Sequence, residues 1–325
     1  MCYNINVKEI INGGVTDMSN IMVTGASGMI GMFLSSSLLH KGHKVFATDS
    51  KSNEFVGKDP NYQFTQCDIT DKGTITSLLS KNIDIVVHLA NSVDNDLDSI
   101  ITDDELKKGK VCDKYIYESA DKAGVKMFLL LSTTAVYGFQ KGREPIREDV
   151  VEKGGTNYAD LKLTSEKFMA KAFKKSSATP VIMRVAPVYT SQYTQNLRDR
   201  VYDSKEDVGY IFDDGNYGFS FCCVFNLVDF INGIISSDTG RKEGIYNVAD
   251  KEMTLAKDII EYEQSHHTIN AVVKRNQGFS LGINKSKMKS DYRYFDPSAT
   301  FSNWCYDITK AKRFATFRWN LKNTK

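Results

Sequence analysis

Residues 20 to 31, with the sequence NIMVTGASGMIG, constrain the fold of this chain more than any other stretch. The apolar run Ile21–Val23 predicts a buried strand, and apolar residues at helical spacing from Met29 onward predict a helix. Three glycines at G-x-x-G-x-x-G spacing lie between and within these elements: Gly25, Gly28 and Gly31. A strand, a glycine turn and a helix in this order indicate the first βα unit of a parallel sheet.

Each glycine of this turn has a separate predicted role. Gly25 permits a tight turn, Gly28 lets a ligand approach the backbone, and Gly31 lets the helix pack closely on the strand. Backbone N–H groups and the positive end of a helix meet at this point, which suits a pyrophosphate. The alternative is a glycine-rich turn without a ligand.

Asp49 narrows the choice between these two interpretations. It follows a predicted second strand at 44–48 and lies 24 residues after Gly25, near the offset of about 20 residues at which an acidic side chain binds an adenosine ribose. A carboxylate accepts hydrogen bonds from the 2′- and 3′-hydroxyls and repels a 2′-phosphate, so the sequence predicts NAD rather than NADP. The alternative for Asp49 is an ordinary residue of a strand-end turn.

Strands and helices alternate along the first part of the chain. We predict further strands at 62–67, 83–89, 126–131 and 180–185, and helices at 104–123 and 156–176. This order predicts an α/β fold of the Rossmann type, with a doubly wound parallel sheet and right-handed crossovers. Beyond residue 186 we expect helices at 226–236, 254–264 and 307–315 and a strand at 244–248. The predicted domains are an N-terminal tail (1–19), an NAD-binding domain (20–186) and a smaller, partly interleaved substrate-binding lobe (187–325).

Composition restricts the partners of the chain. With 325 residues and a formal net charge of +2, it has no basic excess that would favour nucleic acid. No run of 18 apolar residues and no signal-peptide pattern is present, so we expect no membrane partner. The six cysteines lack C-x-x-C spacing and are expected to be reduced thiols of a cytoplasmic protein, with no metal site.

The predicted chemistry lies where two strands end. A hydroxyl-rich stretch that includes Thr133 follows the fifth strand, and Tyr158 and Lys162 are four residues apart on one helix face. A phenol has a pKa near 10, and a neighbouring ammonium would lower it. Tyr158 is then able to take a proton from a sugar hydroxyl while hydride leaves the same carbon, with Thr133 holding the oxygen. The alternative is a surface Tyr–Lys pair.

At this point the chain resembles extended short-chain dehydrogenases/reductases of the NAD-dependent epimerase/dehydratase type. The motifs that carry the resemblance are TGASGMIG (24–31), Asp49, CDI (67–69), HLA (88–90), LSTTAVYG (131–138), YADLK (158–162) and RVAPVY (184–189). Weaker likeness continues to the C-terminal region.

The resemblance implies a set of site residues. The catalytic set would be Thr133, Tyr158 and Lys162. The residues implied at the cofactor are Gly25, Ser27, Gly28, Met29, Ile30, Gly31, Asp49, Asp68, Ile69, Leu89, Ala90, Asn91, Tyr158, Lys162, Pro187 and Val188. Relatives carry an Asn on the central helix as a fourth member of the set, and Gly109 stands at that place.

Departures from the family pattern concern the substrate. Thr134 and Ala135 stand where 4,6-dehydratases carry an Asp–Glu pair, which argues against that reaction. Phe219 stands where epimerases carry an Arg for the diphosphate, and such charge-assisted contacts are strong anchors. We expect Thr134, Arg198 and Arg293 at the substrate, with Arg198, Arg200 or Arg293 able to replace that missing cation.

Three functions remain open. The first is an NAD-dependent nucleotide-sugar epimerase that works by transient hydride transfer at C4. The second is an NAD(P)-dependent dehydrogenase or 4-keto-sugar reductase of the same family. The third is a regulatory NAD-binding protein without turnover. The resemblance also implies a homodimer joined through helices 104–123 and 156–176, with apolar surface from Tyr115, Ile116, Phe168, Met169, Ala172 and Phe173.

Overall fold

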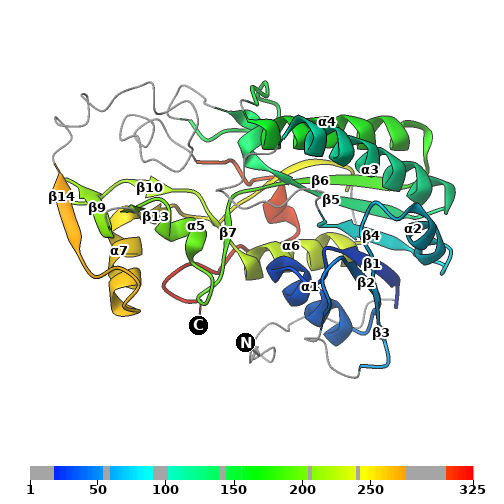
Figure 1. Ribbon diagram of the computed structural model, residues 1–325, viewed down its shortest axis with the longest axis horizontal. Helices are drawn as coiled ribbons and strands as arrows, with labels where there is room; N and C mark the ends of the chain where they lie inside the picture. Colours follow the sequence, from blue (N-terminus) through cyan, green and yellow to red (C-terminus); the bar gives the residue numbers. More distant parts are fainter. Residues whose placement is uncertain are drawn as a thin grey trace. The chain divides into compact units, whose positions relative to one another are not determined.

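The fold was analysed in a computed structural model of the chain (Figure 1). The structure describes residues 18–53, 59–90, 102–138, 144–154, 156–203, 207–238, 242–275 and 305–324. These residues form two compact units. The first unit lies within Met1–Val136, Gly154–Arg184 and Val228–Tyr246, and the second within Tyr137–Lys153, Val185–Leu227 and Asn247–Lys325.

A seven-stranded sheet in the order β12-β6-β5-β4-β1-β2-β3 organises the first unit. Its strands are β1 (Asn20–Thr24), β2 (Lys44–Asp49), β3 (Tyr62–Gln66), β4 (Ile85–His88), β5 (Met127–Thr133), β6 (Thr179–Val185) and β12 (Gly244–Val248). β3, β2, β1, β4 and β5 pair in parallel. The strand order reverses between β1 and β4, which is where sheets of this type bind their ligands. The predicted α/β fold with a doubly wound parallel sheet is therefore confirmed.

The central strands are apolar along their length because both faces of the sheet are covered. Ile21, Met22 and Val23 of β1 are fully buried, and every residue of β4 is buried. Burial on both sides explains why these strands read as continuous apolar runs in the sequence rather than as an alternating pattern.

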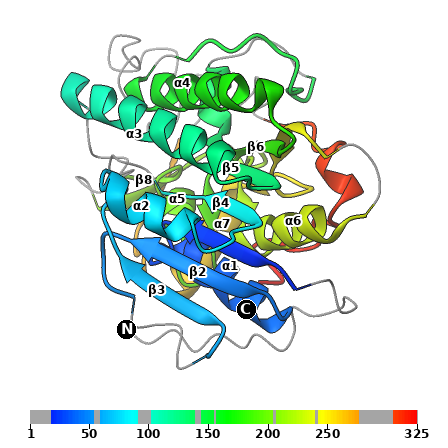
Figure 2. The same cartoon turned by 90° about the vertical axis from the view of Figure 1, so that its right-hand side faces the viewer.

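Helices cover both faces of this sheet (Figure 2). α2 (Lys72–Leu79), α3 (Asp103–Lys122) and α4 (Asn157–Ala172) share one apolar core with the sheet, to which Ile75, Ile116 and Met169 belong. α1 (Met29–His40) and α6 (Val224–Ser236) lie on the opposite face, where Asn232 Nδ2 donates to Ser37 Oγ at 2.8 Å.

Side-chain caps fix where the helices on the first face begin. Thr102 and Glu105 form a capping box at the start of α3, and Thr156 accepts a hydrogen bond from Ala159 N at the start of α4. The predicted helix at 104–123 is thus confirmed as α3. The predicted helix at 156–176 is α4 followed by a 3₁₀ turn, η3 (Phe173–Lys175).

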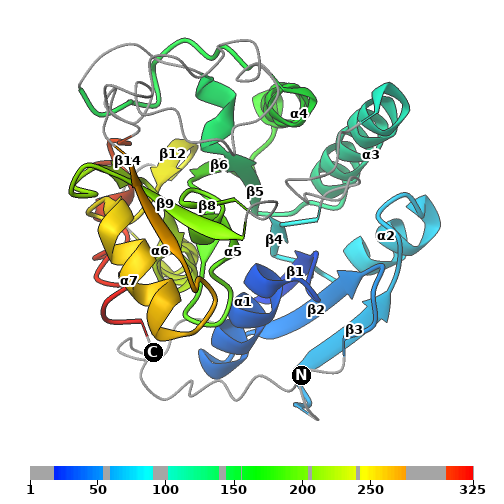
Figure 3. The ribbon, with the colours of Figure 1, turned by 60° about the vertical axis from the view of Figure 1, so that its left-hand side comes forward.

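The second unit has its own apolar core and several short strands. α5 (Gln195–Arg198) and α7 (Ala256–Ser265) pack with β7 (Val188–Tyr189), β8 (Tyr202–Asp203), β9 (Val208–Phe212), β10 (Gly218–Phe219), β11 (Cys222–Cys223), β13 (Thr254–Leu255) and β14 (Val272–Arg275). β14, β9 and β8 form one small sheet, and α7 lies beside it (Figure 3).

The prediction of a helix at 307–315 is wrong. The structure has only a 3₁₀ turn there, η6 (Ala311–Arg313). Asp307 Oδ1 accepts a hydrogen bond from Thr309 N at 2.8 Å, and such a side-chain turn competes with the first turn of a helix.

Candidate active site

The three glycines of the turn after β1 differ in how much space surrounds them. Gly25 has φ +71°, and a Cβ there would lie 2.8 Å from Ala90 N. A Cβ at Gly31 would lie 2.3 Å from the Gly25 carbonyl oxygen. A Cβ at Gly28 would meet only that same oxygen at 3.4 Å, so the space over Gly28 is open. The backbone therefore requires Gly25 and Gly31, whereas Gly28 leaves room for a ligand.

The first turn of α1 suits an anion. Gly28 is the N-cap residue, no side chain caps the helix, and no acidic residue lies in its first turn. The positive end of the helix thus faces the space above Gly28, and the helix itself supplies no carboxylate to neutralise it. Ser27, Met29 and Ile30 lie at the same turn, each half-buried. This arrangement fits the pyrophosphate of a dinucleotide.

Asp49 lies beside this turn at the end of β2. Its Oδ2 accepts a hydrogen bond from Ser27 N and its Oδ1 accepts one from Lys51 N, both at 3.0 Å. Each carboxylate oxygen has capacity for a further hydrogen bond. Asp49 therefore ties the glycine turn to the strand that follows it and can still accept from ribose hydroxyls.

The residues that follow β3 and β4 lie at the same end of the sheet as the glycine turn and Asp49. Ala90 N donates to Thr24 Oγ1 at 3.2 Å, and Leu89 N donates to the Thr24 carbonyl oxygen at 3.2 Å, so the chain after β4 is held against the end of β1. Asp68 is exposed, and hydrogen bonds from Thr70 lower its pKa. Ile69 packs against the core on the α2 side. Asn91, which the sequence also indicated, lies outside the described residues.

Thr133, Tyr158 and Lys162 come together at the end of β5. The Thr133 side chain lies close enough to the Tyr158 phenol to lower its pKa, and Lys162 Nζ donates to the Leu131 carbonyl oxygen at 3.0 Å. Tyr158 is half-buried in the first turn of α4, and Lys162 follows one turn later with 4% of its surface exposed. The surface-pair interpretation is therefore wrong for Lys162.

The phenol differs from the sequence expectation in one respect. The sequence predicts that Lys162 lowers the pKa of Tyr158. In the protein alone, burial raises the pKa of Tyr158 to about 12, and the neighbouring Thr133 side chain only partly offsets this rise. The reason is desolvation of the phenolate, together with a Lys162 ammonium that hydrogen-bonds to Leu131.

A buried polar network lies directly behind these residues, and the sequence analysis missed it. Arg184 of β6 donates to Glu166 of α4, with Nη2–Oε2 at 2.7 Å, and Ser132 Oγ donates to Glu166 Oε1. On the other side of Lys162, His88 Nε2 lies 3.6 Å from Asp113 Oδ1. The available signal was periodicity, because Glu166 lies one turn after Lys162 on the face of α4 that must be buried.

The remaining candidates differ in where the structure places them. Thr134 is buried at the start of a 3₁₀ turn, η2 (Thr134–Tyr137). Pro187 and Val188 belong to the second unit, as does Arg198, whose Nη2 donates to Gln195 Oε1 at 2.5 Å and whose guanidinium lies over the Tyr202 ring. Arg293 lies outside the described residues.

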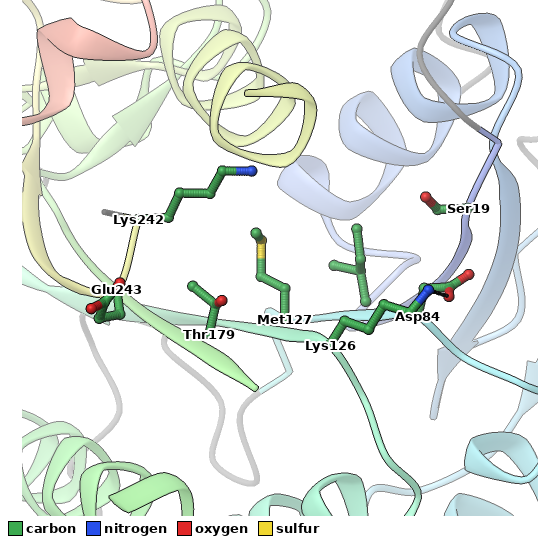
Figure 4. Close-up of a pocket in the computed structure, with 8 residues that line it drawn as sticks. Ser19, Asp84, Lys126, Met127, Thr179, Lys242 and Glu243 are labelled. Carbon is green, nitrogen blue, oxygen red and sulfur yellow. Dashed lines mark ion pairs between the residues drawn. The ribbon is translucent and has the colours of Figure 1, made fainter. Parts of the chain in front are cut away.

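A separate cavity lies at the opposite end of the strands from the glycine turn (Figure 4). Its lining residues stand at the amino ends of the strands: Ser19, Asp84, Ile85, Lys126, Met127, Thr179, Lys242 and Glu243. Asp84 and Lys126 form an ion pair in its wall, with Oδ1 and Nζ 2.8 Å apart. Gly25, Asp49, Ala90 and Thr133 follow the carboxyl ends of parallel strands, so this cavity is not the predicted cofactor site.

Comparisons with known proteins agree with this geometry. Human dTDP-D-glucose 4,6-dehydratase is 29% identical over 54% of this chain and 53% of its own length. UDP-glucose 4-epimerase from Neisseria meningitidis is 30% identical over 41% of this chain and 42% of its own length. The chain thus spans about half the length of these curated relatives.

Solved structures show the same fold over nearly the whole chain. UDP-glucuronic acid 4-epimerase from Bacillus cereus, in complex with NAD, superimposes with a TM-score of 0.70 at 20% identity and covers 94% of this chain and 95% of its own. The family model of the NAD dependent epimerase/dehydratase family matches residues 21–249, which is most of the sequence. With the glycine turn, Asp49 and the Thr133–Tyr158–Lys162 group in place, the chain belongs to the NAD dependent epimerase/dehydratase family.

Proposed function

We propose that this protein is a nucleotide-sugar epimerase that acts at C4 of the sugar. The observation that carries the proposal is the meeting of Thr133 and Tyr158 at the carboxyl end of β5, where Lys162, one helical turn after Tyr158, is bonded to the Leu131 carbonyl oxygen of the same strand. In this role Thr133 holds the oxygen of the reacting carbon, and Tyr158 takes up and returns its proton. Lys162 stabilises the charged form of Tyr158 during that transfer.

The cofactor is NAD, since the family depends on it. When bound, NAD supplies an acceptor for hydride from the sugar carbon. The protein would hold it through the N–H groups of the turn at Ser27–Ile30, through Asp49 at the adenosine ribose, and through Lys162 at the other ribose. Asp68, Ile69, Leu89, Ala90, Pro187 and Val188 are proposed to line the rest of the cofactor site.

Two observations on the chain restrict the reaction. The positions after Thr133 are Thr134 and Ala135, so the acid–base pair needed to eliminate water is lacking there. The similarity to a UDP-glucuronic acid 4-epimerase and to a UDP-glucose 4-epimerase supports epimerisation. The chain is also similar to a dTDP-D-glucose 4,6-dehydratase, but it lacks that acid–base pair at Thr134 and Ala135.

A dehydrogenase or 4-keto-sugar reductase of the same family is the second candidate, and Phe219 favours it. Phe219 packs among aromatic rings, with its centroid 5.9 Å from that of Tyr217 and 6.1 Å from that of Phe221. It therefore supplies no cation for a sugar-linked diphosphate. Arg198 of α5 is the described residue that we propose in its place.

One experiment separates these candidates. The purified protein is denatured, and the released cofactor and any nucleotide are identified by mass spectrometry. The native protein is then incubated with a panel of nucleotide sugars while absorbance is followed at the NADH band. An epimerase retains NAD and interconverts C4 epimers without net NADH, whereas a dehydrogenase produces NADH in step with substrate. Failure to convert any sugar would overturn both enzymatic proposals, and a protein that still releases NAD on denaturation would then have the regulatory NAD-binding role.

We also propose that the chain forms a homodimer through α3 and α4, although three of the six residues predicted to supply its apolar surface are buried. Ile116, Met169 and Phe173 are buried in the chain's own core and are not available to a partner. Tyr115, Phe168 and Ala172 are only partly buried, and Val111 of α3 is 58% exposed. A monomer in light scattering at micromolar concentration would refute the dimer.

A cytoplasmic location is part of the same proposal. Five cysteines, Cys67, Cys112, Cys222, Cys223 and Cys305, are free thiols, as expected in a reducing compartment. In the part of the chain that the structure describes, no helix is long and apolar enough to cross a membrane. Fluorescence microscopy of the tagged full chain would test the location.

A further inference from the structure

Helices α3 and α4 place an acid beside Lys162. The two helices lie side by side on one face of the sheet (Figure 2) and follow parallel strands, so they run in the same direction. Tyr117 of α3 hydrogen-bonds to Ser165 of α4. One turn earlier on each helix, Asp113 and Lys162 come into the same register and interact electrostatically. Only 6% of Asp113 and 4% of Lys162 is exposed.

His88 does not neutralise Asp113 in its neutral form. Its Nδ1 lies 2.7 Å from Thr24 Oγ1, and its Nε2 faces Asp113 Oδ1 at 3.6 Å. Because a carboxylate only accepts, the proton of this contact lies on Nε2 of His88. His88 and Lys162 are thus the two groups next to Asp113 that hold its carboxylate in the charged form.

Glu166 is already engaged with a different cation. Arg184 Nε lies 3.1 and 3.3 Å from its two carboxylate oxygens, and Arg184 Nη2 lies 2.7 Å from Oε2. This is the forked geometry that pairs one guanidinium with one carboxylate. Glu166 is thus neutralised by Arg184, which leaves Asp113 as the other buried carboxylate that acts on Lys162, and the formal charge of these four side chains sums to zero.

We propose that Asp113 is a positioning residue of the active site, whose carboxylate is the counter-ion that keeps the buried Lys162 ammonium charged. The proposal rests on the proposed roles of Tyr158 and Lys162. An isolated ammonium inside a protein loses its proton rather than stay charged without a partner. Without Asp113, Lys162 would become a neutral amine at lower pH and could no longer stabilise the phenolate of Tyr158.

The directions of the pKa values agree with this pairing. Burial would raise the pKa of Asp113, but His88 and Lys162 hold it below its usual value. Burial lowers the pKa of Lys162, and Asp113 and then Glu166 counteract that effect.

The titratable and charged groups around the pair come from every element packed against it. They are Cys112 and Tyr117 of α3, His88 of β4, Tyr158 and Glu166 of α4, and Arg184 of β6. Burial raises the pKa of Tyr117 and of Cys112, so both stay neutral near pH 7. Asp113 is therefore the acid whose removal changes the charge next to Lys162.

The pKa of Lys162 can be measured without any substrate. Lysine side chains are labelled with ¹³C, the Lys162 resonance is assigned by its loss in Lys162→Arg, and the shift is followed against pH. In Asp113→Asn we expect the Lys162 pKa to fall by about one to three units, the usual effect of losing an adjacent opposite charge. In turnover assays, the alkaline limb of the pH profile should move to lower pH by a similar amount.

Controls separate this role from a purely structural one. Glu118 lies on the same helix as Asp113, and its side chain is 50% exposed. Glu118→Gln should therefore leave the Lys162 pKa unchanged. Asp113→Thr removes the charge but keeps a polar side chain, and it replaces Asp113→Asn if the latter does not fold. An unchanged Lys162 pKa in a folded Asp113 variant would overturn the proposal. So would a Lys162 that titrates below pH 7 in the unmodified protein. A protein without epimerase activity would leave this titration interpretable, so the two proposals fail separately.

Discussion

Lys162 Nζ lies 3.0 Å from the carbonyl oxygen of Leu131, and this hydrogen bond joins helix α4 to strand β5 at the candidate active site. Leu131 is two residues before Thr133, and Lys162 is one helical turn after Tyr158. The contact therefore fixes the register in which the Thr133 hydroxyl meets the Tyr158 phenol. Lys162, which we propose to act through its charge, therefore also positions Thr133 and Tyr158, which we propose to touch the substrate.

Tyr158→Phe should reduce turnover by about 10²- to 10⁴-fold, the usual contribution of a positioned acid–base group. The substitution removes the hydroxyl that transfers the proton and keeps the ring. NAD binding should change little because the glycine turn and Asp49 remain intact. Steady-state kinetics on the identified sugar and a titration with NAD measure the two effects. Tyr193→Phe, at a tyrosine that is 49% exposed, is the matched control. Full activity in Tyr158→Phe would remove the catalytic assignment.

Gly28→Ala and Gly31→Ala should have opposite consequences. A Cβ at Gly31 would lie 2.3 Å from the Gly25 oxygen and 2.6 Å from Ala26 Cα, so Gly31→Ala should destabilise the protein by about 1–3 kcal/mol. A Cβ at Gly28 enters open space, so Gly28→Ala should fold normally but lose affinity for NAD, whose pyrophosphate needs that space. Thermal unfolding and NAD titration of both variants test the pair. Normal NAD affinity in Gly28→Ala would show that the ligand does not approach there.

Asp49→Ala should weaken NAD binding by about 1–3 kcal/mol, the range for lost hydrogen bonds to a charged group. Part of this loss comes from the glycine turn itself, since Asp49 also accepts a hydrogen bond from Ser27 N at 3.0 Å. Asp49→Asn keeps an acceptor for that N–H and removes the charge. Its affinity for NAD should therefore fall only slightly, whereas its preference for NAD over NADP should fall strongly. Calorimetric titration with both cofactors measures this. Equal affinity of the unmodified protein for NADP would contradict the prediction.

Much of the first unit could be predicted from the sequence because its elements carry strong local signals. Ile21–Val23 and the residues of β4 are apolar throughout, and Gly25 and Gly31 stand where the backbone admits no side chain. The Tyr158–Lys162 spacing identified one helix face. These features depend on neighbours in the sequence, which is why pattern analysis detects them.

The parts that escaped prediction depend on distant partners. Strands such as β7 and β11 have two residues each, too few for a period to appear. Asp113 and Glu166 look like ordinary surface acids of their helices until His88, Lys162 and Arg184 come into place from other elements. The phenol of Tyr158 was expected to have a lowered pKa, and only the structure shows the burial that raises it.

Asp250 of the second unit is a buried acid that should make stability depend on pH. Its Oδ1 accepts from Cys223 N and Asn226 Nδ2, both at 2.7 Å, and its Oδ2 accepts from Tyr189 OH at 2.8 Å. Burial nevertheless raises the pKa of Asp250 from 3.8 to about 6. A folded-state pKa above the unfolded value means that protonation favours folding. This contribution is fully present below about pH 4 and is lost as the pH rises to about 6.

Asp250→Asn should remove this pH dependence. Its amide oxygen can accept from Cys223 N and Asn226, and its NH₂ group can donate to the Tyr189 oxygen, so the hydrogen bonds survive without a buried charge. Relative to the unmodified protein, the variant should gain stability as the pH rises from 4 to 6, by up to about 3 kcal/mol, and the difference should then stay constant. Urea unfolding at a series of pH values measures it. Asp214→Asn, at an exposed acid of the same unit, should show no such change. A stability difference between Asp250→Asn and the unmodified protein that is the same at pH 4 and pH 7 would mean that Asp250 is ionised at no cost in the folded state.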